Sequence, residues 1–263
     1  MDVTVDGKRA HAATGSRENA PEDPAVILIH GAGLDRTIWQ MQTRNIAFRG
    51  RRVYAVDLPG HGRSEGPVLE SVPEMADWIA RFMDAAAVEK ATVMGHSMGS
   101  LIALEVAARH TERVERLILT GVAEAMPVHP DLLAAAHANE PLGPELIVFW
   151  GLGEKAQTGG HPLPSLWVHG ASEVLLKNAR AGVLGNDLAA CNDYGSATEA
   201  AEQVSCPTFF VLGRDDKMTP VKSGKALAGR IDGAQVNVLE RCGHMMMIER
   251  PNEMYTALRD VIF

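Results

Sequence analysis

The chain has 263 residues, of which 46% are hydrophobic and 22% charged, as in ordinary globular proteins, and this composition excludes a disordered chain, a collagen-like fibre and a coiled coil. With 25 basic and 33 acidic residues, the formal net charge is −8. The sequence therefore offers no basic face, and we expect neither nucleic acid nor an anionic membrane as a partner.

Cysteine usage and the first residues indicate a reducing compartment. The three cysteines are widely spaced and form no CxxC pair, so they predict no disulfide framework. The first 15 residues lack the apolar core of a signal peptide, and no apolar run approaches the roughly 18 residues of a membrane span. We expect a cytoplasmic protein; the sequence does not indicate its oligomeric state.

The first half of the chain alternates short apolar runs with amphipathic stretches. Ala25–Ile29 is continuously apolar, which is typical of a strand buried on both faces. The elements predicted after it are helix Thr37–Phe48, strand Val53–Val56, helix Pro73–Ala87, strand Thr92–Met94, helix Met98–Arg109 and strand Val114–Leu119. This alternation predicts βαβ units and hence an α/β fold, with a mostly parallel sheet and helices on both faces.

The pattern resumes near the C-terminus after a segment of different character. The resumed elements are strands Pro207–Leu212 and Gln235–Leu239 and helices Val221–Ala228 and Asn252–Phe263. The segment before them, Val122–Val204, is interrupted by prolines and glycines, and its helical pieces are Leu132–Ala138, Ser172–Ala181 and Ala197–Val204. We predict a core of residues 1–121 and 205–263, with residues 122–204 inserted after the fourth long strand as a helical lid. An extra core layer is the alternative.

Residues 95–99 read GHSMG and fit the pattern G-x-S-x-G between a predicted strand and a predicted helix. This context is that of a nucleophile elbow, in which a sharp turn exposes the serine at the carboxyl edge of the sheet. Gly95 and Gly99 remove the Cβ atoms that would crowd such a turn. The helix that follows offers unpaired N–H groups and a positive dipole end beside Ser97. The alternative is a turn with a capping serine.

With these motifs the chain resembles the α/β-hydrolase superfamily over nearly its whole length, in particular its serine esterase and lactonase branch. The matching segments are HGAG at 30–33, DLPGHGRS at 57–64, GRDD at 213–216 followed by Thr219-Pro220, and CGH at 242–244 followed by ERP at 249–251. The order serine, acid, histidine also matches the family.

The resemblance implies a catalytic triad of Ser97, Asp216 and His244. Serine is a weak nucleophile, so His244 would take its proton and later return it to the leaving group. A carboxylate would orient the imidazole and favour its cation. The family's usual G-x-x-D spacing selects Asp216, with Asp215 as the adjacent competitor and Glu124 as a more distant one.

By the same family pattern, the backbone N–H groups of Ala32 and Met98 would form the oxyanion hole, with Gly33 as the neighbouring alternative to Ala32. We further interpret His30 as bracing its loop and His61 as a surface or loop-supporting residue. The four histidines of the insertion are interpreted as solvated; they are His129, His137, His161 and His169. No HExxH or similar cluster is present, and no GxxxxGK[ST], so we expect no metal, nucleotide or other cofactor.

Several side chains are candidates for contact with the substrate. They are His96, Trp39, Trp150, Trp167 and Met245, with Phe149 and Leu163 as further lining positions. Some of these have an alternative interpretation. Trp39 could lie in the core, and His96 could pack behind the turn. Met245 and the three apolar residues after it could pack in the core. The lining itself does not identify the substrate.

The predicted function is that of a serine hydrolase, which cleaves a carboxylic ester, lactone or thioester of a small apolar molecule through an acyl-enzyme. Relatives with the same triad cleave carbon–carbon bonds of ring-fission diketones, act as cofactor-free haloperoxidases or perhydrolases, or are hydroxynitrile lyases. The carbon–carbon hydrolases often carry Asn before the serine and Pro in the HG loop, from which His96 and HGAG depart. A non-catalytic ligand receptor is the third hypothesis.

Overall fold

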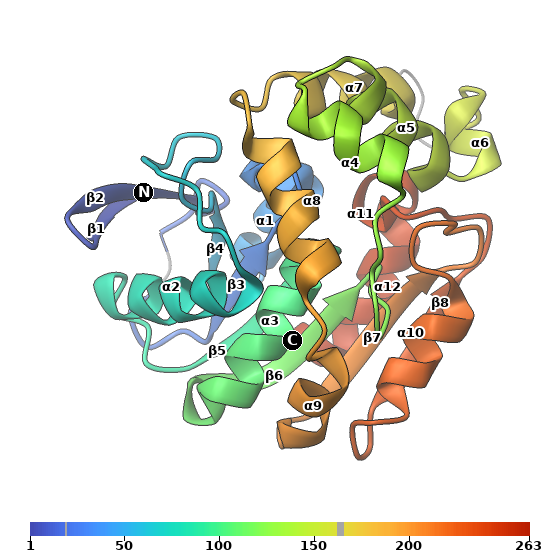
Figure 1. Cartoon of the computed structure of the whole chain (residues 1–263). Helices are drawn as coiled ribbons and strands as arrows, with labels where there is room; N and C mark the ends of the chain where they lie inside the picture. Colours follow the sequence, from blue (N-terminus) through green and yellow to red (C-terminus); the bar gives the residue numbers. More distant parts are fainter. Residues whose placement is uncertain (19, 162–165) are drawn as a thin grey trace.

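The computed structural model describes residues 1–18, 20–161 and 166–263, and its centre is an eight-stranded sheet with the order β1-β2-β4-β3-β5-β6-β7-β8 (Figure 1). The strands are β1 (Asp2–Val5), β2 (Lys8–Ala13), β3 (Ala25–Ile29), β4 (Arg52–Val56), β5 (Ala91–His96), β6 (Val114–Thr120), β7 (Thr208–Gly213) and β8 (Gln235–Leu239). β1 and β2 pair antiparallel with each other, and β2 pairs antiparallel with β4. The remaining strand pairs are parallel.

Helices connect the parallel strands and cover both faces of the sheet. They are η1 (Arg36–Trp39), α1 (Gln40–Phe48), α2 (Val72–Ala85), α3 (Met98–Arg109), η2 (Thr111–Arg113), α4 (Pro130–His137), α5 (Leu142–Gly151), α6 (Glu154–Gln157), α7 (Val168–Lys177), α8 (Val183–Asp193), α9 (Ala197–Gln203), α10 (Val221–Ala228), α11 (Met246–Glu249) and α12 (Pro251–Ile262). Apolar residues of α2, α3 and α10 belong to the core on one face, and those of α1 and α12 to the core on the other face (Figure 1).

The central strands are apolar on both faces because both faces are covered. All five residues of β3 are buried, as expected for a parallel strand between two helical layers. The edge strand β8 instead has an exposed or half-buried residue at four of its five positions. The α/β fold with a mostly parallel sheet and helices on both faces is therefore as predicted.

The segment between β6 and β7 contains helices α4 to α9 and, in its described residues, no strand. In Figure 1, α4 to α7 gather above the ends of the strands, while α8 descends along the molecule to α9. α4 packs against α5 and α8, and α9 packs against α3. Ala197, Ala200 and Ala201 of α9 join the same apolar cluster as α3, so the last part of this insertion is a layer of the core.

Some elements differ from the sequence prediction. The N-terminal hairpin β1–β2 was not predicted, and its turn consists of Asp6 and Gly7, both at positive φ. The predicted helix Thr37–Phe48 is divided into the 3₁₀ turn η1 and α1. Helices α5, α6, α8 and α11 were also not predicted. In the described part of the chain, no helix combines the length and the apolar character that crossing a membrane requires.

Candidate active site

Ser97 lies at the sharp turn between β5 and α3. Its backbone has φ 54° and ψ −121°, a conformation that costs a residue with a side chain on the order of 1–3 kcal/mol. A Cβ atom added at Gly95 would overlap the carbonyl oxygen of Gly99, and one added at Gly99 would overlap that of Ile29. The glycines thus permit the close packing that the turn needs, and Ser97 remains 8% exposed.

Asp216 and His244 are joined by a buried hydrogen bond. His244 Nδ1 lies 2.8 Å from Asp216 Oδ2, and the two side chains are 2% and 0% exposed. The amides of Met218 and Thr219 donate to Asp216 Oδ1, and the Thr219 hydroxyl donates to Oδ2 over 2.6 Å. The carboxylate therefore faces donors on both oxygens.

These donors determine the charge state of Asp216. Burial disfavours the carboxylate, but the charge of His244 and the hydrogen bonds from His244 and Thr219 outweigh it and hold the pKa of Asp216 below its ordinary value. The competitor Asp215 is exposed and Glu124 is half-buried, and His244 makes its carboxylate contact with Asp216.

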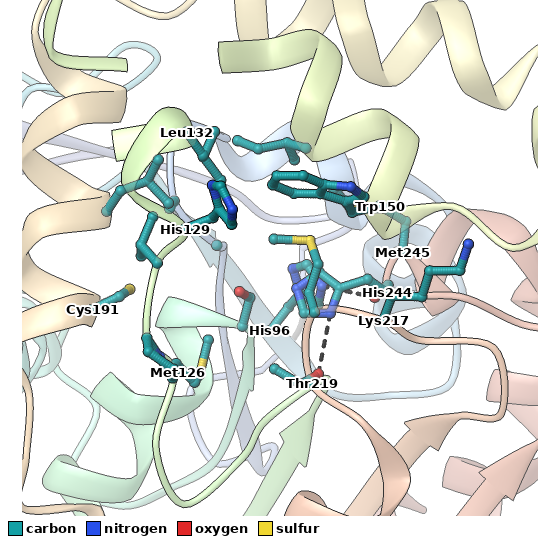
Figure 2. Close-up of a pocket in the computed structure, with 18 of the residues that line it drawn as sticks. His96, Met126, His129, Leu132, Trp150, Cys191, Lys217, Thr219, His244 and Met245 are labelled. Atoms are coloured by element: carbon teal, nitrogen blue, oxygen red, sulfur yellow. Dashed lines mark hydrogen bonds between the residues drawn. The ribbon is translucent and has the colours of Figure 1, made fainter. Parts of the chain in front are cut away.

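The other ring nitrogen of His244 belongs to a side chain that lines the same cavity as Ser97. His244 Nε2 is buried and has no hydrogen-bond partner among the described residues, Ser97 Oγ included. Both residues line one cavity, which Figure 2 shows in close-up. Without a substrate, bonds between a serine and its base are often long and tighten on binding. When the ring is neutral and Nδ1 donates to Asp216, Nε2 is the nitrogen that can accept a proton.

Two backbone amides beside Ser97 are available to a ligand. Neither the Ala32 nor the Met98 N–H has a hydrogen-bond partner in the described part of the chain. The alternative, the Gly33 N–H, already donates to Asp187 Oδ2 over 2.8 Å. A Cβ atom at Gly31 would lie 3.1 Å from Ser97 Cβ, so the missing side chain lets this loop approach the serine.

The cavity has a volume of about 430 Å³ and a mainly apolar lining. Its wall includes the α4 region and α5 of the insertion as well as the sheet edge; among its residues are Leu34, Met126, Leu132, Ile147, Trp150, Leu188, Lys217 and Met245. Of the predicted contact residues, His96, Trp150 and Met245 line it. The remaining three apolar residues of that stretch, Met246 to Ile248, are buried in the core.

The other predicted lining positions are corrected by the structure. Trp39 is fully buried in the apolar core that α1 and α12 share and is not among the residues that line the cavity. Trp167 is 65% exposed and stacks against His169, and Phe149 is 57% exposed. Neither lines the cavity. Leu163 lies outside the described residues.

The histidines outside the site have varied roles. His30 braces its loop as expected, by hydrogen bonds with the Gly31 carbonyl and the Leu58 amide. The surface interpretation of His61 is wrong, because this side chain is buried and pairs with Asp187. His129, one of the histidines assigned to solvent, lines the cavity and lies 5.5 Å from the Trp150 ring.

Sequence reasoning missed two polar residues that hold the site. Thr219 was noted only as part of a matching segment, yet its hydroxyl binds Asp216. Glu249 accepts from the amides of Gly243 and Met245, the chain neighbours of His244, and from the amide of Gly153 in the insertion. Burial raises the pKa of Glu249, against the effect of these three amides. The only signal for either residue was its place in a family motif.

Comparison with known proteins places the chain in a family. A profile described as "Alpha/beta hydrolase family" matches residues 26–257, which is most of the sequence. The chain belongs to the α/β-hydrolase family. It is accordingly an enzyme of the hydrolase class.

Curated relatives and solved structures cover nearly the full length. The chain is 27% identical to the pimeloyl-[acyl-carrier protein] methyl ester esterase of Aromatoleum aromaticum, over 91% of this chain and 98% of that protein. It is 28% identical to the 2-hydroxy-6-oxo-6-phenylhexa-2,4-dienoate hydrolase of Comamonas testosteroni, over 89% and 86% of the two chains. The enol-lactonase of Burkholderia xenovorans LB400 shares the fold, with a TM-score of 0.86, 22% identity and 99% and 98% coverage.

Proposed function

We propose that this hydrolase cleaves the carboxylic ester, lactone or thioester bond of a small, apolar molecule. The observation that carries the proposal is the pair Asp216–His244: the His244 side chain lines the same cavity as Ser97 at the elbow, and its Nε2 has no partner among the described residues. Serine needs a base to react near neutral pH, and an imidazole held by a carboxylate is such a base. The proposal needs no cofactor.

The reaction has two halves. Ser97 Oγ attacks the carbonyl carbon as its proton passes to His244 Nε2, and the carbonyl oxygen becomes an oxyanion between the Ala32 and Met98 amides. When this intermediate collapses, the bond to the leaving oxygen or sulfur breaks and that atom takes the proton from His244. Water then attacks the acyl-enzyme, gives one proton to His244, and releases the acid while Ser97 regains its proton.

The cavity supports this substrate class. Its volume of about 430 Å³ and apolar lining suit a compact acyl or alcohol group, with Trp150 and Leu132 on the side of the insertion. We infer that the part of residues 122–204 that carries α4 to α7 acts as the lid, because α4 and α5 supply part of this wall. The end of the insertion, α9, belongs to the core instead. His96, His129 and Lys217 are polar residues of the lining, besides the proposed catalytic residues and Thr219.

A fluorophosphonate probe tests the nucleophile without knowledge of the substrate. We expect stoichiometric labelling of Ser97 in the folded protein and none in Ser97→Ala. A folded wild-type chain that stays unlabelled would favour a ligand receptor over an enzyme and would contradict the proposal. Mass spectrometry of the labelled peptide identifies the modified residue.

A second candidate is hydrolysis of a carbon–carbon bond in a ring-fission diketone, and the relative from Comamonas testosteroni favours it. His244 would take the proton of Ser97 or of a water as that oxygen adds to the ketone. The carbon–carbon bond then breaks, the carbanion takes the proton from His244, and an acyl group on Ser97 is released by water. Haloperoxidase or perhydrolase activity is a further use of the same residues. A panel of p-nitrophenyl esters of increasing acyl length, run beside such a diketone, separates the two candidates. Ester turnover without diketone turnover supports the first.

A further inference from the structure

Asp187 of the insertion reaches the loop that carries the Ala32 amide. Asp187 lies on α8, its side chain is fully buried, and its Oδ2 accepts from the Gly33 amide and from His61 Nε2, each over 2.8 Å. Three segments that are far apart in the sequence thus meet at one carboxylate oxygen.

The geometry around His61 fixes its protonation state. Its Nδ1 lies 3.0 Å from the Pro59 carbonyl oxygen, and its Nε2 lies 2.8 Å from Asp187 Oδ2. Both neighbours are acceptors, and a neutral imidazole donates from only one nitrogen. His61 is therefore an imidazolium in an ion pair with Asp187. Burial lowers the pKa of His61, but the charge of Asp187 and its hydrogen bond outweigh it, so the pKa is raised.

His30, beside His61, has the opposite protonation state. Its Nε2 accepts from the Leu58 amide over 3.2 Å, so its Nδ1 carries the proton and donates to the Gly31 carbonyl over 2.9 Å. Burial and then the charge of His61, whose ring centroid is 4.8 Å away, lower the pKa of His30 to about 4. One ring of this pair is thus neutral and the other charged.

Because a peptide unit is planar, these contacts fix the direction in which the Ala32 N–H points. The Gly31 carbonyl and the Ala32 N–H belong to one planar unit, and that carbonyl is held by His30 and by the Leu34 amide. The next unit contains the Gly33 N–H, which Asp187 holds. Ala32 therefore lies between two fixed peptide planes, one held from the core and the other from the insertion.

Close packing supports the second of these anchors. Gly33 has φ +66°, and a Cβ atom added there would lie 2.7 Å from Leu184 Cδ1 on α8. The loop and α8 are therefore in direct contact, and a shift of α8 would move the loop. Neither Asp187 nor His61 is among the residues that line the cavity.

We propose that the Asp187–His61 ion pair positions the Ala32 amide for the oxyanion, so that the insertion contributes to the rate of the chemical step. The inference rests on the proposed function, in which the Ala32 N–H stabilises the transition state. Asp187 and His61 act as positioning residues, through the Gly33 amide, and touch no reacting atom.

The rate of Ser97 phosphonylation by a fluorophosphonate tests the proposal in Asp187→Asn. We expect labelling to be about 10- to 100-fold slower than in the wild type, since complete loss of one oxyanion donor costs about 10²- to 10³-fold. On a short p-nitrophenyl ester, kcat is expected to fall by a similar factor while KM changes less than about threefold, because the donor acts on the transition state. Asp193→Asn, at an exposed position on the same helix, is the matched control and should label at the wild-type rate.

Circular dichroism establishes that each variant is folded at the labelling temperature. Equal rates for folded Asp187→Asn and wild type would overturn the proposal, because a purely structural role changes the unfolding temperature alone. Absence of labelling in the wild type itself would instead refute the proposed function. If Asp187→Asn does not fold, His61→Gln decides: the proposal requires slower labelling there, and a wild-type rate would overturn it.

Discussion

His96 Nε2 donates a hydrogen bond to the backbone carbonyl of His244 over 2.9 Å, and the two rings lie 4.7 Å apart. The residue before the proposed nucleophile is thereby attached to the loop of the proposed base. Burial and then the charge of His244 lower the pKa of His96 well below its ordinary value, so the ring is neutral and its Nδ1 carries no proton.

Stability should fall in acid because of buried neutral histidines. The unfolded chain protonates His96 near pH 6.5 while the folded chain resists, so the unfolded state binds more protons and the free energy of unfolding decreases as pH falls below about 6.5. His30 acts in the same direction down to its pKa of about 4. Urea unfolding at pH 7, 6 and 5 measures the slope. In His96→Asn we expect the slope to be shallower by up to about 1.4 kcal/mol per pH unit; an unchanged slope would contradict the neutral ring.

Replacing each of two adjacent aspartates by asparagine should show which one is the acid of the triad. Asp216→Asn removes the charge that holds the His244 ring in its tautomer and should lower kcat by about 10²- to 10⁴-fold. Asp215→Asn is the control, because its side chain is exposed, and should change kcat less than about twofold. Steady-state kinetics on a p-nitrophenyl ester gives both values. The reverse order would assign the acid to Asp215.

The hydroxyl of Thr219, and not the volume of its side chain, should keep the pKa of Asp216 low. Thr219→Val keeps the volume but leaves Asp216 Oδ2 without this donor, so we expect the pKa of Asp216 to rise and the protein to lose about 1–2 kcal/mol of stability. The acid limb of the pH–rate profile should move to higher pH. Thr219→Ser retains a hydroxyl and serves as the control. A profile of Thr219→Val that superimposes on that of the wild type would refute the role.

Gly121 tests how tightly the His244 ring is held. Gly121 has φ +58°, and a Cβ atom there would lie 3.1 Å from the Cε1 and Nδ1 atoms of His244. Gly233 has φ +69° with nothing within 4 Å of its added Cβ, so Gly233→Ala introduces the backbone strain alone. Both variants should lose about 1 kcal/mol of stability, but only Gly121→Ala should lose kcat, by about tenfold or more. Equal kcat values in the two variants would show that the ring adapts.

Local patterns predicted the core of the fold because they act over a few residues. The strand, GHSMG and helix follow one another directly, and β3 is apolar throughout because both of its faces are covered. The hairpin was missed although Asp6-Gly7 is a favoured turn sequence, because β1 and β2 are short and apolar at only half of their positions. Within the insertion, Pro144 obscured α5, where it lies in the first turn and is tolerated.

The site was predictable only where a motif carried it. The segments around Ser97, Asp216 and His244 each match a family pattern, and the structure brings Asp216 and His244 together. The role of Asp187 had no sequence signal, since its partners Gly33 and His61 are more than 100 residues away. Trp39 and Trp167 were misplaced because an aromatic residue type does not specify which layer or surface it faces.

The three hydrogen bonds from backbone amides to the Glu249 carboxylate constrain how a substrate reaches the cavity. A movement of the chain around Gly153 away from Met245 would leave a buried carboxylate short of donors, which costs on the order of 1–3 kcal/mol for each unsatisfied group. The stretch from Met126 to Leu132 also borders the cavity, and it is joined to α8 by an exposed hydrogen bond, from the Val128 amide to Asn192 Oδ1. We therefore expect the route of entry to open on that side, with the α6 end of the insertion as the stationary pivot.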